Sequence, residues 1–224
     1  KRYQTIYAVN DGSVAAPTAG LHFTDNVLGR LKEKGIEFQY ITLHVGLGTF
    51  RPIKTETLED HIMHEESVCV SRRLIESILN FPDKKIIAVG TTALRTLESI
   101  YWFGLRLYSD KQKKIDKFYV SQWQPYEYKM DELVAKTQCL EAIIDMMENK
   151  NIEYLYGDTR LMVVPCYDFQ IVDALISNFH MPCSSLLLLI AAFVGNDWKK
   201  IYDYALKNDF RFLSYGDSSL LFRN

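Results

Sequence analysis

Hydrophobic and polar positions change period several times along this chain, and each change marks a predicted element. Short runs rich in β-branched and aromatic residues predict strands, and they lie at 3–9, 36–45, 67–70, 84–90 and 160–164. Apolar residues spaced three and four apart predict helices, and they lie at 24–35, 71–80, 94–102, 131–149, 184–194 and 197–206. Segment 169–179 is apolar but has no clear period.

Capping residues define where three of these helices begin. Thr24 and Ser71 stand where an N-cap is expected, and Ser184 opens an apolar run. Gly35 stands where a glycine commonly ends a helix. The apolar run Leu186–Val194 has nine residues, whereas a membrane-spanning helix needs roughly 20. We therefore expect a buried helix there.

The alternation of strands and helices predicts an α/β fold. We expect a single three-layer α/β/α domain over 1–224 with a mostly parallel or mixed sheet. A content of 48% hydrophobic and 24% charged residues is typical of globular proteins. The net charge of -2 disfavours a non-specific nucleic-acid binder and still allows a local basic patch. Four cysteines without a CxxC pair, and a start without an apolar signal core, favour a cytoplasmic protein with reduced thiols and no structural zinc.

Four short loops join glycine or other small residues to a polar residue able to do chemistry. They are GSVAAPTAGLH, LHVGLGTFRP, VGTTALRTLE and SNFHMP, and each follows or adjoins an apolar segment. Loops at the carboxyl ends of strands in α/β sheets tend to converge on one crevice. Any one of these loops is weak evidence, because glycine-rich turns are common. Together they predict one ligand site.

Histidines in three of these loops are candidate site residues. His44 ends a predicted strand just before Gly46 and Gly48, which would let backbone N–H groups face a ligand. Imidazole is also the side chain best suited to move protons near neutral pH. The alternative for His44, as for His22 and His180, is a histidine held by a neighbouring carbonyl.

The sequence HIMHEE carries two histidines and two glutamates over 61–66. Its order, HxxHE, matches neither HExxH nor HxxEH, so we expect no metal site. The remaining interpretations are a solvated loop, or a loop from which Glu65 or His64 reaches the crevice as a base or hydroxyl binder.

A helix begins at Thr91 and Thr92, and its free N–H groups and two hydroxyls suit a carboxylate or a phosphate. Arg95 and Glu98 follow on the same helix. Their spacing of three also suits a simple surface ion pair. Asp217 in SYGD either caps a turn or binds a ribose diol.

These motifs also carry a family resemblance. In order, GSVAAPTAGLHFT, TLHVGLGTFRPI, MHEE, VGTTALRTLES, SNFHMP and FLSYGDSSLL resemble the S-adenosylmethionine:tRNA ribosyltransferase-isomerase family of queuosine biosynthesis. The match runs from about Tyr3 to Phe222 and is weakest between Gly104 and Tyr156. Six motifs in one order form a specific signal.

The resemblance implies a transferase-isomerase. Such an enzyme moves the ribosyl moiety of S-adenosylmethionine onto 7-aminomethyl-7-deazaguanine at the wobble position of tRNA. The product is epoxyqueuosine-tRNA, and adenine and methionine leave. S-adenosylmethionine is then a consumed ribosyl donor rather than a permanently bound cofactor. We expect a cytoplasmic monomer or weak homodimer with tRNA as its partner and no membrane contact.

That chemistry suggests catalytic roles for four residues. The sulfonium acidifies the neighbouring 5′ protons, so a base must remove one, and His44 and Glu65 are the candidates. Departing adenine needs a proton, which His22 or His180 would supply.

Other residues of the same motifs are candidates for binding S-adenosylmethionine. They are Thr18, Gly46, Gly48, Thr49, Gly90, Thr91, Thr92, Arg95, Glu98, Asn178 and Asp217. Thr18, Glu98 or Asp217 would hold the ribose diol. Arg95 and the Thr91–Thr92 turn would hold the methionine end.

The chain departs from the family pattern in three ways. The pattern begins upstream of Lys1 and includes a small β-barrel domain, so we expect this chain to be a fragment without that domain. Cys166 and Cys183 stand where the family usually has the glycine of PGY and the lysine of NFHxPKS. The extra length at 104–156 suggests an insertion.

Two other functions remain open at this point. One is a non-catalytic tRNA- or nucleotide-binding remnant of the same fold. The other is an ordinary S-adenosylmethionine-dependent methyltransferase, which would carry a GxGxG-type loop after its first strand, and this chain does not. Only the ribosyltransferase-isomerase would release free adenine.

Overall fold

The computed structural model describes residues 4–8, 16–44, 55, 57–109 and 117–223. The helices are α1 Asp25–Glu33, α2 Arg72–Asn80, α3 Thr91–Ser109, α4 Lys136–Asn149, α5 Ser185–Val194 and α6 Asp197–Lys207. The strands are β1 Thr42–His44, β2 Glu66–Ser71, β3 Ile87–Val89, β4 Phe118–Val120, β5 Tyr154–Thr159, β6 Ala174–Asn178 and β7 Ser218–Phe222. Short 3₁₀ helices occupy Thr18–His22, Gln124–Glu127 and Met130–Glu132.

The strands form two mixed sheets, so the predicted α/β class is confirmed, with its strands divided between two sheets. One sheet has the order β1-β2-β5-β4 and the other has the order β3-β6-β7. Strands β4 and β5 run parallel, as do β3 and β6. The pairs β1-β2, β2-β5 and β6-β7 are antiparallel.

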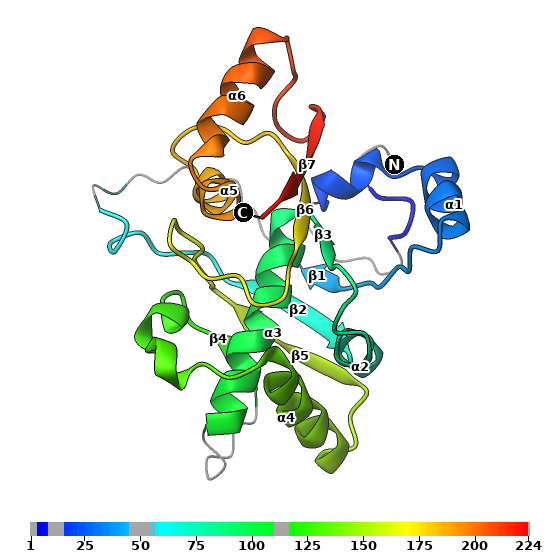
Figure 1. Ribbon diagram of the computed structural model, residues 1–224, viewed down its shortest axis with the longest axis vertical. Coiled ribbons are helices and arrows are strands. Elements are labelled where there is room, and N and C mark those ends of the chain that lie inside the picture. Colours follow the sequence, from blue (N-terminus) through cyan, green and yellow to red (C-terminus); the bar gives the residue numbers. More distant parts are fainter. Residues whose placement is uncertain (1–3, 9–15, 45–54, 56, 110–116, 224) are drawn as a thin grey trace.

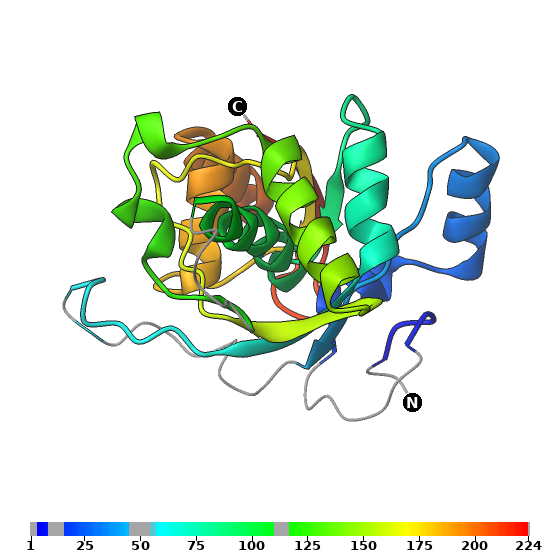
Figure 2. The ribbon, with the colours of Figure 1, turned by 90° about the horizontal axis from the view of Figure 1, so that it is seen from below.

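Helix α3 runs through the middle of the molecule, with α4 along one side of it (Figure 1). Ile100 and Phe103 of α3 are fully buried, as are Leu140 and Ile143 of α4. The two helices approach closely at Gly104, because a Cβ there would lie 2.4 Å from the carbonyl oxygen of Cys139. Helix α1 and the segment leading to β1 lie at one side of the molecule, apart from α3 and α4 (Figure 2).

The four-stranded sheet turns one face toward the central helices. Val68 and Val70 of β2 and Leu155 of β5 are buried in the core. Successive residues of a strand point to opposite faces, so Tyr154 and Tyr156 point the other way and are exposed. This sheet therefore packs on its inner face against a core that contains α3.

The three predicted N-caps are confirmed, whereas the helix predicted from 131 begins at Lys136. The side-chain oxygens of Thr24, Ser71 and Ser184 accept hydrogen bonds from backbone N–H groups three residues ahead, at the starts of α1, α2 and α5. Gly35 follows α1 with a positive φ of 76°. Of the helices described, none is long and apolar enough to span a lipid bilayer.

Several predicted strands are wrong. The described part of 3–9, residues 4–8, forms bends and turns, and of the described residues 36–44 only Thr42–His44 form a strand. Segment 160–164 is not a strand either, whereas β5 lies immediately before it. Leu161, Met162 and Val163 are buried, and the backbone N–H groups of Arg160 and Met162 donate to the carbonyls of Val120, the last residue of β4, and of Gln122. The apolar run therefore reported burial rather than a strand, which misled the prediction.

Candidate active site

Three of the four predicted loops meet at one small crevice. The crevice lies between the N-terminal 3₁₀ helix, the β3–α3 junction and the end of β6. Its lining residues are Ala16, Pro17, Thr18, Ala19, Leu43, Val89, Gly90, Thr91, Thr92, Ala93, Ser177, Asn178, His180 and Leu186. Most of the fourth loop, including Gly46, Gly48 and Thr49, lies outside the described residues, and its first residue, Leu43, lines the crevice.

Small residues let the backbone come close at this crevice and beside it. Gly20 follows the lining residue Ala19, and a Cβ on Gly20 would lie 2.0 Å from the hydroxyl oxygen of Tyr7, so a larger residue there would push the Tyr7 side chain aside. Gly90 has a φ of 95°, which favours glycine. Its N–H donates to Ile176 at 2.8 Å and its carbonyl accepts from Leu94 at 3.1 Å, so the residue joins β3 to the first turn of α3.

Two histidines are tied to the end of β6. The side-chain amide of Asn178 lies 2.9 Å from Nε2 of His22, and the hydroxyl of Ser177 lies 2.8 Å from Nε2 of His180. The backbone N–H of His180 donates to the hydroxyl of Tyr202 at 3.0 Å. The structure therefore brings His22, His180 and Asn178 together at the end of β6.

The imidazole of His180 is held neutral. Burial lowers the pKa of His180 to about 4, because a charged ring in the interior loses its hydration. At neutral pH, His180 therefore acts as a neutral hydrogen-bonding group rather than as an acid.

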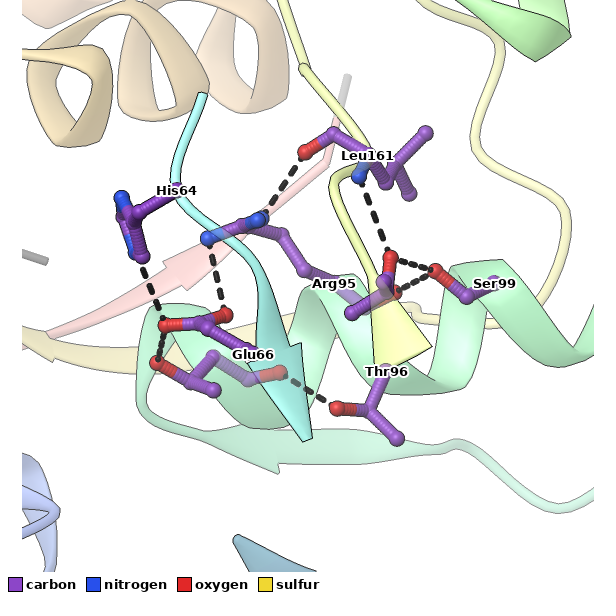
Figure 3. Close-up of polar contacts among 8 residues, drawn as sticks. His64, Glu66, Arg95, Thr96, Ser99 and Leu161 are labelled. Atoms are coloured by element: carbon purple, nitrogen blue, oxygen red, sulfur yellow. Dashed lines mark hydrogen bonds and ion pairs between the residues drawn. The ribbon is translucent and has the colours of Figure 1, made fainter. Parts of the chain in front are cut away.

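Glu66 forms the centre of a buried polar cluster beside the crevice (Figure 3). It is 0% exposed, and its Oε2 lies 2.8 Å from Nη1 of Arg95. Its Oε1 accepts from the hydroxyl of Thr92 at 3.1 Å and lies 3.2 Å from Nε2 of His64. Burial alone would raise the pKa of the Glu66 carboxyl. The charge of Arg95 and the hydrogen bonds from His64 and Thr92 outweigh it and lower that pKa below its ordinary value.

Arg95 belongs to this cluster and does not form the surface pair that its spacing with Glu98 suggested. The Arg95 side chain is 2% exposed, and its Nε donates to the carbonyl of Leu161 at 2.8 Å. The guanidinium therefore holds Glu66 and the chain after β5 together (Figure 3).

Glu98 is also buried, but it binds the backbone of its own protein. Its carboxylate accepts from the N–H groups of Gln170, Ile171 and Val172 and from the hydroxyl of Tyr167, at 2.9–3.0 Å. Burial raises the pKa of Glu98, and these hydrogen bonds only partly oppose it. The structure thus places Glu98 in the core, bound to segment 167–172, away from the crevice lining.

Three further candidates lie on the surface. Asp217 accepts from the backbone and side chain of Arg211, which lowers its pKa. Glu65 pairs with Arg160 at 3.1 Å, and both side chains are about 40% exposed. His44 ends β1 and is exposed. None of these three lines the crevice as the structure describes it.

Sequence reasoning chose Glu65 and missed its neighbour Glu66. The signal lay in the period of β2: Glu66 shares strand parity with the apolar Val68 and Val70 and so points with them into the core. Across the residues that the structure describes, no three His, Cys, Asp or Glu side chains gather in a way that would hold a metal ion.

Comparison with known proteins places these motifs in a family. A family model described as "Queuosine biosynthesis protein" matches residues 1–221. The chain is 40% identical to the S-adenosylmethionine:tRNA ribosyltransferase-isomerases of Halothermothrix orenii and Thermotoga petrophila, covering 98–99% of this chain and 52–53% of those proteins.

A solved structure agrees. The crystal structure of S-adenosylmethionine tRNA ribosyltransferase from Thermotoga maritima is 30% identical with a TM-score of 0.58, covering 91% of this chain and 51% of that one. The chain thus spans about half the length of the curated relatives it matches.

Proposed function

Because the chain belongs to the queuosine biosynthesis protein family, we propose that it acts in the ribosyl transfer for which its relatives are named. The proposed reaction moves the ribosyl moiety of S-adenosylmethionine onto 7-aminomethyl-7-deazaguanine in tRNA, with release of adenine and methionine. The proposed partners are therefore S-adenosylmethionine and a tRNA that carries this base, in the cytoplasm.

One observation carries this proposal. Three motifs that lie far apart in the sequence, and that carry the family resemblance, line a single crevice. A crevice with few convergent polar groups is the usual form of a small-molecule site. We assign it to part of S-adenosylmethionine, with Thr18, Gly90, Thr91, Thr92 and Asn178 as the binding residues.

The first turn of α3 suits the carboxylate of the methionine end. Helix α3 has 19 residues, and Thr91 and Thr92 of its first turn line the crevice. The Thr92 hydroxyl donates to Glu66, so the backbone N–H groups of this turn and the hydroxyl of Thr91 are the donors for a ligand. A helix N-terminus favours negative charge. Arg95 is bound to Glu66, so it would stabilise this turn through Glu66 rather than contact the ligand.

The crevice also supports a choice between the two candidate proton donors. His180 is neutral at neutral pH, so it has no extra proton to give. His22 is only partly buried and its Nε2 is bound by the amide of Asn178. We therefore propose His22 as the group that protonates departing adenine, and His180 as a neutral group that orients Ser177.

The experiment is an adenine-release assay. The chain is mixed with S-adenosylmethionine and an anticodon stem-loop that carries 7-aminomethyl-7-deazaguanine, and the products are separated by chromatography. We expect adenine only when the modified RNA is present. S-adenosylhomocysteine instead of adenine would indicate a methyltransferase, and RNA binding by a folded chain without adenine would support the binding remnant.

A substitution in the crevice sharpens the same test. Ala19 is 3% exposed and lines the crevice, so Ala19→Leu would fill the space that a ligand needs. We expect it to abolish S-adenosylmethionine binding, measured by calorimetry, while the circular-dichroism spectrum stays native. Unchanged binding in a folded Ala19→Leu chain would show that S-adenosylmethionine does not bind in this crevice.

A further inference from the structure

The cluster around Glu66 contains a histidine that the proposed ligand contacts leave unused. His64 lies two residues before the start of β2, with its side chain 19% exposed, and its Nε2 lies 3.2 Å from Oε1 of Glu66. The same oxygen accepts from Thr92, which lines the crevice. One carboxylate oxygen therefore joins the His64 ring to the crevice wall (Figure 3).

The bonding of Glu66 determines which ring nitrogen of His64 can accept a proton. An ionised carboxylate only accepts hydrogen bonds, so Nε2 of His64 must carry the hydrogen that faces Glu66. A neutral imidazole has one N–H. The lone pair is therefore on Nδ1, on the opposite side of the ring.

Glu66 itself is unable to turn away. Arg95 holds its Oε2 at 2.8 Å and Thr92 holds its Oε1 at 3.1 Å, and the carboxylate is fully buried. A histidine oriented by a fixed carboxylate is a common arrangement for proton transfer, because the carboxylate sets the tautomer and stabilises the imidazolium that forms.

We propose that His64 is the base that removes the 5′ proton of S-adenosylmethionine, and that Glu66 is the positioning residue that orients it; this inference rests on the proposed function. The carbon–hydrogen bond breaks, and its electron pair stays on the carbon next to the sulfonium. The proton goes to Nδ1 of His64, and Nε2–H stays bound to Glu66. This assignment takes up His64, which the sequence HIMHEE left open as a base, in place of the catalytic candidates His44 and Glu65.

The first test removes the base. In His64→Ala, adenine release should fall about 10²- to 10⁴-fold, the usual contribution of a general base, and added imidazole should restore part of the rate. A purely structural role would not respond to imidazole. His61→Ala is the matched control: His61 lies in the same segment, and its backbone carbonyl rather than its ring binds Gln122. Full activity in a folded His64→Ala chain would overturn the proposal.

The second test separates the two adjacent glutamates. Glu66→Gln should lower kcat by about 10²-fold, the cost of misplacing a reacting group by about 1 Å, with the S-adenosylmethionine KM little changed. Glu65→Gln should cause a smaller loss, since Glu65 pairs with Arg160 at the surface. A larger loss in Glu65→Gln than in Glu66→Gln would contradict the assignment. A thermal melt of each variant excludes unfolding as the cause, and His64→Gln, which leaves Glu66 and Arg95 in place, serves where Glu66→Gln does not fold.

Deuterium at the 5′ carbon reports proton removal separately from adenine release. It therefore distinguishes a wrong base from a wrong proposed function. S-adenosylmethionine deuterated at C5′ is incubated with the chain and the modified stem-loop, and loss of deuterium to water is followed by mass spectrometry. Deuterium loss that disappears in His64→Ala supports the base even where no adenine is released. Adenine release that survives in His64→Ala refutes the base and leaves the proposed function intact. No deuterium loss from the wild-type chain refutes the base as well.

Discussion

Two glutamates are fully buried, Glu66 of β2 and Glu98 of α3, and their surroundings give them opposite properties. Glu66 meets a cation, Arg95, and its pKa is lowered. Glu98 meets only backbone N–H groups and the hydroxyl of Tyr167, and burial raises its pKa. A nearby positive charge can outweigh the loss of hydration, whereas neutral donors do so only in part.

The two regions also differ in what each carboxylate connects. Glu66 pairs with Arg95 and hydrogen-bonds to Thr92 and His64, so its contacts include a residue of the crevice lining, Thr92. Glu98 accepts hydrogen bonds from three successive backbone N–H groups at 170–172, so it holds a connecting segment in the core. The same residue type therefore supports the site in one region and the fold in the other.

The largest effect should come from breaking the charged pair. Arg95→Met leaves the Glu66 carboxylate buried without its cation, and breaking such a pair costs about 3–5 kcal/mol. Urea denaturation at neutral pH should show this loss in the free energy of unfolding. Arg160→Met is the matched control, since its pair with Glu65 is about 40% exposed on both sides and should contribute at most about 1 kcal/mol.

The pH dependence of that loss checks its electrostatic origin. The pKa of Glu66 is lowered on folding, so the stability that it contributes is present above its ordinary value of 4.5. This contribution is lost as pH falls through the folded-state pKa. The difference between wild type and Arg95→Met should therefore shrink in acid. A difference that stays constant down to acid unfolding would mean that packing, not charge, is what the substitution removes.

A smaller effect should follow at the other glutamate. Glu98→Gln replaces one accepting oxygen with an NH₂ group, so two of four donors lose their acceptor. Each such loss costs about 1–3 kcal/mol, partly offset because a neutral amide is buried more easily than a carboxylate. We expect a net loss of about 2 kcal/mol in the free energy of unfolding.

Hydrogen exchange distinguishes the two regions in that variant. The amides of Gln170, Ile171 and Val172 should exchange faster in Glu98→Gln than in the wild type. The amide of Leu161, beside Arg95, should keep its protection. Equal acceleration at both places would show that the two clusters form one cooperative unit, and the comparison between them would fail.

The smallest expected effect is a gain at Cys166, beside the segment that Glu98 holds. Cys166 has a φ of 81°, a left-handed conformation that costs a residue with a Cβ about 1–2 kcal/mol. Cys166→Gly, which restores the glycine of the family pattern, should therefore stabilise the chain by about 1 kcal/mol and raise Tm. Cys166→Ala keeps the Cβ and should bring no gain. A lower Tm for the glycine variant would show that the thiol makes contacts worth more than the strain.

The comparison also shows where sequence reasoning reached its limit. The predicted helix caps at Thr24, Ser71 and Ser184 are confirmed, because capping depends on residues three positions apart. Strand β5 was missed because it contains Gly157, a poor strand former in isolation. A Cβ there would lie 1.9 Å from the carbonyl oxygen of Phe118, so glycine is required by the neighbouring strand β4. That requirement is invisible within the segment itself.

In the candidate site, too, some features could be predicted from the sequence and others could not. The motifs identified the loops of the crevice, including Thr18, Gly90 and Asn178, since glycine and small residues beside polar groups form a local pattern. They chose Glu65 and a surface pair of Arg95 with Glu98. The structure instead gives a buried pair of Arg95 with Glu66.

By itself, the sequence determined the α/β class, the three capped helix starts and the loops that line the crevice. These features depend on residues close together in the chain, whose periodicity and capping can be read directly. Only the tertiary structure decided which partner each buried acidic residue receives and which pKa moves in which direction. Pairing joins residues such as Glu66 and Arg95, which are distant in sequence, so no local pattern contains it.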